Sequence, residues 1–343
     1  MVPDPALVDR FRRDLDALCA LGRRIGIAVS GGPDSLALLI LAAAARPGLI
    51  EAASVDHDLR RDSRSEAEMV EGLCRHLGVP HVILTVHWPE RPTSAVQERA
   101  RAARYALLAT WAKDRSLDAV ATAHHADDQA ETLIMRLNRG SGVRGLAAMR
   151  PVATVPGSDI ALVRPLLGWT RNELGAICVA ASLSPVTDPS NADEHYERVR
   201  VRAALADAQW LDRDAVGRSA AHLAAADDAI SWAAEGEWAR AVTPGEDLIV
   251  YTPLGAPAEI VRRIVVRAIA ALAHEGNGEQ LRARELDTVM AALTTGQQVT
   301  LRGVICAGGE EWRFTRASQR TADPLDRHHR RRLVRFGPAP DST

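Results

Sequence analysis

Lysine is almost absent from this chain of 343 residues, because Lys113 stands alone among its 42 basic residues. A Walker-type phosphate-binding loop needs a lysine directly after its glycines. Lys113 follows a tryptophan and an alanine instead. The sequence therefore excludes a nucleotide site of that class.

Cysteine is also scarce, with four residues and no C-x-x-C pair: Cys19, Cys74, Cys178 and Cys306. Structural zinc sites, iron–sulfur clusters and disulfide frameworks need cysteines at close, regular spacing. The scattered positions disfavour all three. We expect these thiols to pack as small core hydrophobes.

Long apolar runs are missing as well. The longest, residues 36–45, is about half of the roughly 18 residues that a membrane span requires. The N-terminus carries charges where a signal peptide has an apolar core. We therefore expect no membrane partner and a cytoplasmic location.

The net charge is only −2, so the chain has no strong overall field for a polyanion. Contact with a nucleic acid would have to come from local arginine patches, of which the sequence has several. Length and a hydrophobic content of 47% favour one large core and a smaller one.

Strand-like and helix-like segments alternate in the first part of the chain. Apolar, β-rich runs lie at 24–30, 49–56, 81–87 and 117–124, and segments of helical period lie at 34–46, 63–77 and 94–114. This order predicts an α/β fold with a doubly wound parallel sheet, whose ligand site lies at the carboxyl ends of the strands. Residues 151–159 read as a loop or hairpin, and residues 183–202 as a polar, turn-rich segment.

The pattern of the sequence changes beyond about residue 215. Alanine-rich helices are predicted at 217–242, 257–274 and 282–294, followed by a short β-like pair within 297–317. We place the first domain at 1–215, a smaller, mainly helical domain at 216–322, and a basic tail at 323–343 that we expect to be disordered.

The stretch SGGPDS, residues 30–35, follows the first predicted strand and opens a helix. Paired glycines let successive backbone N–H groups point into one concavity, where hydroxyls and the positive helix N-terminus favour an anion. A plain tight turn with Asp34 or Ser35 as helix cap accounts for one glycine and one polar residue. A phosphate nest better explains all five of Ser30, Gly31, Gly32, Asp34 and Ser35.

A second polar cluster, HHADDQAET at 124–132, follows the fourth predicted strand. Asp128 and Glu131 lie three residues apart and share one helix face, where they can hold an ammonium group or Mg²⁺. An acidic first turn, favoured by the helix dipole, suffices for Asp127. His124 and His125 lack further ligands at zinc spacing, so we interpret His124 as packing or shaping the site.

These motifs resemble a known family. SGGPDS is similar to the signature of the ATP-pyrophosphatase, or PP-loop, superfamily, which cleaves ATP between its α- and β-phosphates. Residues 123–149 resemble the tRNA(Ile)-lysidine synthetase family within it. More of the family pattern follows at 55–60, 100–105, 164–167 and 187–193, and the similarity covers about residues 21–205.

The resemblance implies a carbon–nitrogen ligase that uses ATP and Mg²⁺, with tRNA(Ile) bearing a CAU anticodon and free L-lysine as substrates. It implies that the nucleotide is bound by Ser30, Gly31, Gly32, Pro33, Asp34, Ser35, Asp56 and His57. It implies catalytic roles for Asp34, Arg101, Asp128 and Glu131. Lysine or tRNA would contact Asp128, Glu131, Arg139, Arg144, Arg198 and Arg202, and Mg²⁺ would lie at Asp34 and Asp128. The second domain would bind tRNA, and a homodimer is allowed.

The chain departs from the family pattern at Asp58, where glycine is usual, and at Val199, where asparagine is usual. Two other functions stay open. One is a tRNA thiolase on the same fold, which the scattered cysteines disfavour. The other is an ATP-binding module without turnover, which the presence of both Asp128 and Glu131 disfavours.

Overall fold

The computed structural model describes residues 3–58, 63–186, 196–208, 210–273, 281 and 283–317. The chain divides into two compact units, Met1–Asp227 (unit 1) and Asp228–Thr343 (unit 2). The expectations for residues 187–193 and for the tail at 323–343 lie outside the described residues.

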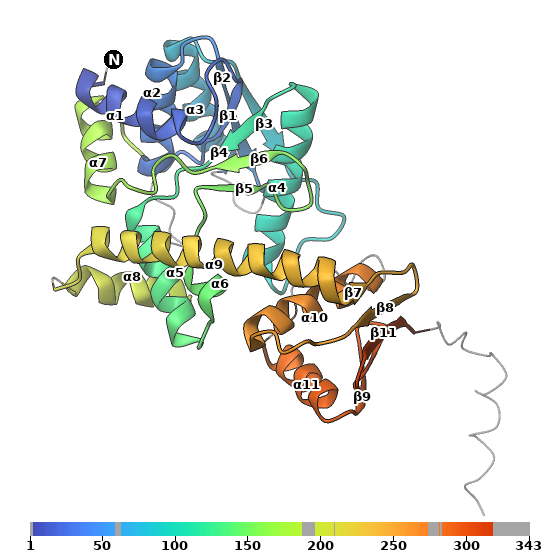
Figure 1. The fold of residues 1–343 in the computed structure, drawn as a ribbon. Helices are drawn as coiled ribbons and strands as arrows, with labels where there is room; N and C mark the ends of the chain where they lie inside the picture. Colours follow the sequence, from blue (N-terminus) through green and yellow to red (C-terminus); the bar gives the residue numbers. More distant parts are fainter. Residues whose placement is uncertain are drawn as a thin grey trace, which may run out of the picture. The chain divides into compact units, whose positions relative to one another are not determined.

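Unit 1 contains a six-stranded sheet in the order β3-β2-β1-β4-β6-β5 (Figure 1). Its strands are β1 Ile25–Ala28, β2 Ile50–Asp56, β3 His81–Thr85, β4 Ala119–Ala121, β5 Val152–Thr154 and β6 Ala161–Val163. All neighbours pair in parallel except β5, which is antiparallel to β6 and forms the hairpin predicted near 151–159. The predicted doubly wound sheet is confirmed.

The helices of unit 1 are α1 Pro5–Asp16, α2 Pro33–Ala45, α3 Ser63–Leu77, α4 Val96–Asp114, α5 Ala126–Asn138, α6 Val143–Leu146, α7 Arg171–Ala180 and α8 Glu197–Asp207. α9, Arg213–Ala241, contains the boundary between the units. The expectation of a turn-rich segment was wrong for residues 197–202, where α8 begins. This helix buries none of its own residues, so its sequence shows no apolar periodicity.

The sheet of unit 1 is covered on both faces. Buried side chains of α1, α2, α3 and α7 pack with Ile25 and Ile27 of β1, while α4 packs with Val120 and Leu162 in a separate cluster. α2 is apolar all round because it is buried between the sheet and the helices α1 and α7, and its residues 36–42 are at most 1% exposed. No helix in the described part of the chain combines the length and apolar character that a membrane crossing needs.

Unit 2 contains α10 Ala258–Leu272, α11 Ala283–Thr294 and an antiparallel sheet in the order β7-β8-β11-β10-β9. Its strands are β7 Val242–Thr243, β8 Leu248–Tyr251, β9 Gln298–Leu301, β10 Val304–Ala307 and β11 Trp312–Arg316. Tyr251 and Phe314 of this sheet pack with α10 and α11 in one core. The predicted helices are present. The sheet is larger than the expected β-like pair, because residues 297–317 form three strands, β9 to β11, and β8, distant in sequence, pairs with β11.

Candidate functional site

The phosphate nest, Ser30–Ser35, lies where β1 ends and α2 begins. Gly31 has a φ of +84°, a conformation that favours glycine. The Ser35 hydroxyl donates to the Gly32 carbonyl (2.9 Å) and accepts from the Ser30 N–H (3.1 Å). Gly32 caps α2 without a side chain, so the first N–H groups of the helix stay available to an anion.

Two contacts hold this loop from behind. The Val186 N–H donates to the Gly31 carbonyl (3.0 Å), and the Cys178 thiol donates to the Pro33 carbonyl (3.2 Å). These bonds anchor the Gly31 and Pro33 carbonyls to α7 and to the segment after it, so the loop is held by contacts of the chain itself.

Asp34 lies in the first turn of α2, beside the nest. Its Oδ1 is buried and has no hydrogen-bond partner among the described residues, and its Oδ2 lies 3.4 Å from His125 Nε2. A buried carboxylate oxygen without a partner suits a cation that also binds phosphate oxygens. Asp34 thus fits the Mg²⁺ that the resemblance implies.

Asp56 ends β2, the strand beside β1, and His57 follows it at the same edge of the sheet. Asp56 Oδ1 accepts a hydrogen bond from the Asp58 N–H (2.9 Å), and the His57 carbonyl accepts from Trp88 Nε1 (2.7 Å). Asp58 has a φ of +50°. This explains why glycine is usual there, and aspartate is among the few residues that tolerate such a backbone.

His125 links the nest to the start of α5. Its ring is 1% exposed, and its Nε2 lies 3.4 Å from Asp34 Oδ2 and 3.5 Å from Asp128 Oδ2, while Nδ1 lies 3.5 Å from Asp127 Oδ2. Burial lowers the pKa of His125, but hydrogen bonding to Asp127 and Asp34 and the nearby charges outweigh it and raise the pKa to about 9. Sequence reasoning missed this residue, although two of its three acidic neighbours, Asp127 and Asp128, lie within three positions of it in the sequence.

Asp128 and Glu131 lie together on α5 as their spacing predicted. Arg198 of α8 donates to both, from Nη2 to Asp128 Oδ1 (2.8 Å) and from Nε to Glu131 Oε2 (2.7 Å). Arg202 Nε donates to Glu131 Oε1 (2.7 Å). Burial raises the pKa of Glu131, but the bonds from Arg202 and Arg198 dominate and hold it below its usual range.

These ion pairs were not anticipated from the sequence, which assigned all four residues to substrate contact and none of them to one another. The structure brings all four into one network. Each carboxylate oxygen can accept two hydrogen bonds. Glu131 Oε2 already accepts from Arg198 Nε (2.7 Å) and Arg202 Nη2 (3.3 Å), so the spare acceptor capacity lies on Glu131 Oε1 and on Asp128.

Asp127 faces away from this network and serves the fold. Its Oδ2 accepts from the Arg171 N–H at the start of α7 (2.8 Å), and its Oδ1 pairs with Arg213 Nε of α9 (2.9 Å). Burial opposes ionisation, but hydrogen bonding to His125 and Arg171 holds the pKa of Asp127 below its usual range. The helix-start interpretation of Asp127 fits these contacts.

The other predicted arginines lie in different settings. Arg101 of α4 donates from Nη2 to the Tyr105 hydroxyl (3.3 Å). Arg139, just after α5, pairs with Glu197 of α8. Arg144 is exposed on α6. Among the contacts of the described residues, none joins these three arginines to Asp128 or Glu131.

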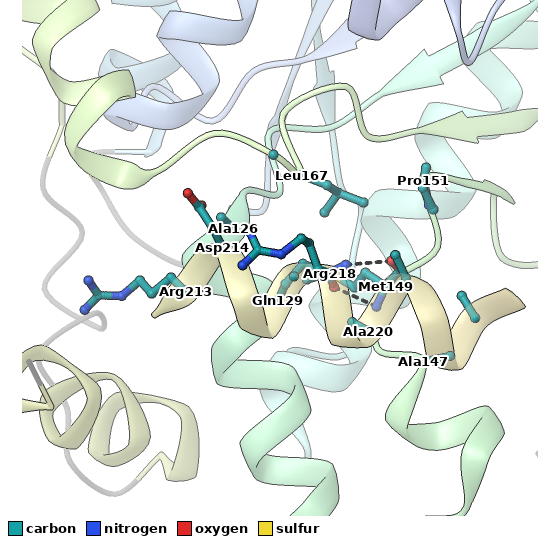
Figure 2. Close-up of a pocket in the computed structure, with 14 residues that line it drawn as sticks. Ala126, Gln129, Ala147, Met149, Pro151, Leu167, Arg213, Asp214, Arg218 and Ala220 are labelled. Carbon is teal, nitrogen blue, oxygen red and sulfur yellow. Dashed lines mark hydrogen bonds between the residues drawn. The ribbon is translucent and has the colours of Figure 1, made fainter. Parts of the chain in front are cut away.

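A cavity of about 380 Å³ lies beside this site, still within unit 1 (Figure 2). Small and apolar residues dominate its lining, including Ala126 of α5, Leu167 and Ala220 of α9. Gln129 borders it and exchanges two hydrogen bonds with the backbone of Met149, drawn as dashed lines in Figure 2. The cavity contains no residue of the nest and neither Asp128 nor Glu131.

The four cysteines are free thiols, three of them buried, as expected for core residues. Burial raises the pKa of Cys178 to about 11 and that of Cys74 and Cys306 to about 12. Such thiols are poor nucleophiles. In the described part of the chain, no group of three or more His, Cys, Asp or Glu side chains is arranged to hold a metal by itself.

Known proteins are similar to this chain in sequence and in fold. The family model described as PP-loop domain matches residues 7–209. A tRNA(Ile)-lysidine synthase of Novosphingobium aromaticivorans is 46% identical to this chain, and the match covers 92% of this chain and 95% of the relative. A tRNA(Ile)-lysidine synthase of Zymomonas mobilis is 43% identical, and the match covers 88% of this chain and 90% of the relative. In fold, the chain is similar to the U34-tRNA thiolase NcsA from Methanococcus maripaludis, with a TM-score of 0.54 and 15% identity over 64% of this chain and 80% of that one.

Proposed function

Because this chain belongs to the tRNA(Ile)-lysidine synthase family of PP-loop proteins and is therefore an ATP-using ligase of tRNA processing, we propose that unit 1 performs both steps of the ligation at one edge of its sheet. The observation that carries this is the His125 imidazole, which lies against Asp34 of the nest and against Asp128 of the acid pair. The ATP site and the amine site are thereby adjacent.

In the first step, O2 of the wobble cytidine attacks the α-phosphate of ATP. The bond between O2 and the α-phosphorus forms, the bond to the β-phosphate oxygen breaks, and pyrophosphate leaves. The nest N–H groups, the Ser30 and Ser35 hydroxyls and the N-terminus of α2 stabilise the phosphate charge. Asp56 and His57, at the end of the next strand, bind the nucleoside part, and Arg101 contacts phosphate or tRNA.

When bound, Mg²⁺ would neutralise phosphate oxygens in this step. Asp34 fits it better than Asp128, because one oxygen of Asp34 lacks a partner among the described residues while both oxygens of Asp128 have polar neighbours.

In the second step, Asp128 and Glu131 receive the ε-ammonium of free lysine. The ammonium releases one proton to solvent, the amine attacks C2, the bond between C2 and O2 breaks, and AMP leaves with that oxygen. The modified base then pairs as uridine does. Arg198 and Arg202 hold the two acids in place and keep Glu131 ionised, which a cation site requires.

The cytidine has to leave the anticodon stack to reach this edge, since bases of single-stranded loops are read by extrusion. Arginines at the rim, Arg139 and Arg144, are placed to contact the anticodon loop, and unit 2 contributes further tRNA affinity. A tRNA substrate favours a cytoplasmic location. The homodimer stays a prediction.

The two other functions are less well supported. A thiolase would need a reactive cysteine, and the raised pKa values of the buried thiols oppose this. A module without turnover would have no use for a buried acid pair beside an ATP nest. Incorporation of lysine into tRNA would contradict both.

Two substitutions should separate the two steps. We expect Asp34→Ala to abolish pyrophosphate release with tRNA present, because the nest loses its cation ligand. We expect Glu131→Gln to spare pyrophosphate release and to raise the lysine KM about ten- to hundredfold, since it loses a charge-assisted contact of about 1.5–3 kcal/mol. Adenylated tRNA should then accumulate. Pyrophosphate release and lysine incorporation are measured on the same samples.

Glu71→Gln, an exposed acid on α3, is the matched control and should change neither rate. Near-normal pyrophosphate release by Asp34→Ala would show that Asp34 does not act in the ATP site. Unchanged lysine dependence in Glu131→Gln would reduce the acid pair to an anchor for α8.

A further inference from the structure

Arg213, the first residue of α9, contacts two segments that support the acid pair. Its Nε lies 2.9 Å from Asp127 Oδ1 at the start of α5, and its Nη2 donates to the Leu205 carbonyl near the end of α8 (3.1 Å). Figure 2 shows its side chain extending away from the other residues that line the cavity. All three residues belong to unit 1. One guanidinium group therefore joins α5, α8 and α9 within unit 1.

The position of α8 depends on polar contacts. This helix buries none of its own residues, and it packs mainly against α5. Its residues Arg198 and Arg202 form the ion pairs that hold the acid pair. A helix without buried apolar side chains has no hydrophobic anchor, so hydrogen bonds and ion pairs fix it in place. The bond from Arg213 to Leu205 is such a contact, because Leu205 lies about one turn beyond Arg202.

Asp127 connects Arg213 to the site by a second route. The Asp127 carboxylate faces Arg213 with Oδ1, while its Oδ2 lies 3.5 Å from His125 Nδ1 and accepts from the Arg171 N–H (2.8 Å). His125 in turn lies 3.5 Å from Asp128 Oδ2 through its Nε2. Two chains of contacts thus lead from Arg213 to the acid pair, one through α8 and one through Asp127.

Other contacts also attach α9 to unit 1. Val216 and Ala220 of this helix are buried, and Arg150 Nη2 donates to Asp227 Oδ2 (2.6 Å). The side chain of Arg213 is 35% exposed, and ion pairs at such exposure add little to the free energy of unfolding. Attachment of α9 therefore does not account for Arg213, whereas the arrangement of the residues around the acid pair does.

We propose that Arg213 is a positioning residue for lysine capture, which acts through α8 and Asp127. The planar guanidinium group offers donors in several directions, so it can hold the end of α8 and the Asp127 carboxylate at once. An acid pair that is already held in place binds an ammonium group without a further ordering cost. This rests on the proposed function and extends it to a residue outside the ion pairs of Asp128 and Glu131.

The test compares the full chain with its Arg213→Gln and Arg213→Lys variants. Arg150→Gln is the matched control, because it removes another contact of α9 and leaves Arg213 intact. The lysine KM is measured by incorporation into a tRNA(Ile) transcript, and single-turnover pyrophosphate release is measured without lysine. We expect Arg213→Gln to raise the lysine KM about three- to tenfold, as for one lost hydrogen bond, and to leave pyrophosphate release unchanged. Arg213→Lys keeps the charge beside Asp127 without the fork, so we expect a smaller rise.

Hydrogen exchange of the α8 amides gives a readout that does not depend on activity. Exchange should be faster in Arg213→Gln than in the parent chain, and unchanged in Arg150→Gln. A normal lysine KM in both Arg213 variants, or a rise that Arg150→Gln matches, would overturn the positioning role. If Arg213→Gln does not fold, Arg213→Lys decides by the same criteria. A parent chain that incorporates no lysine would instead contradict the proposed function, so the two failures are distinguishable.

Discussion

His124 should make the free energy of unfolding depend on pH. Its pKa is about 2 in the folded chain, against 6.5 for the free group, so below pH 6.5 the unfolded chain binds a proton that the folded chain does not. Stability should therefore fall with decreasing pH, by about 1.4 kcal/mol per pH unit for this proton. Urea unfolding of His124→Gln between pH 6 and 4 should show a shallower slope. An equal slope would show that His124 is solvated.

For other single residues, the sequence predicts the backbone conformation and the side-chain partners to different extents. Gly31 and Asp58 both have positive φ values, and only Gly31 indicates this by its residue type. The acid pair was predictable from a three-residue spacing, since a helix face is a local property. The arginines that engage it are not local, because Arg198 lies 67 positions from Glu131. No periodicity could have paired them.

Helices and strands were predictable where the burial of one face imposes a periodic spacing of apolar residues. The strands and the helices α2, α3 and α4 begin and end within a few residues of the expected positions, because each packs an apolar face on the sheet. α8 was missed because ion pairs to α5 hold it instead of apolar contacts. β8 was missed because its partner β11 lies far along the chain.

Gly26 sets the distance between β1 and α4. A Cβ at this position would lie 2.5 Å from Trp111 Cζ3 and 2.8 Å from Leu117 Cδ1. We expect Gly26→Ala to lower the free energy of unfolding by about 1–3 kcal/mol through overpacking. Gly72→Ala on α3, where the new methyl meets nothing, should instead be neutral or slightly stabilising. Equal urea midpoints for the two variants would contradict this packing.

For the whole molecule, the chain divides at Asp227, within α9. Val216 and Ala220 of this helix are buried, and Arg150 pairs with Asp227 (2.6 Å), all within unit 1. We expect a fragment 1–227 to fold and bind ATP with weakened tRNA affinity, and a fragment 1–215 to be less stable. Thermal unfolding and tRNA binding of both fragments check this. Undiminished tRNA affinity of fragment 1–227 would remove unit 2 from tRNA recognition.

The nest and the acid pair, at one edge of the sheet, are proposed to join lysine to a wobble cytidine at the expense of ATP. The most direct measurement incubates the full chain with ATP, radiolabelled lysine and tRNA(Ile) transcripts that differ only at the wobble base. We predict that label enters only the transcript with cytidine there, only with ATP, and with equal release of AMP and pyrophosphate. Label that enters regardless of the wobble base, or ATP cleavage without lysine transfer, would contradict this activity.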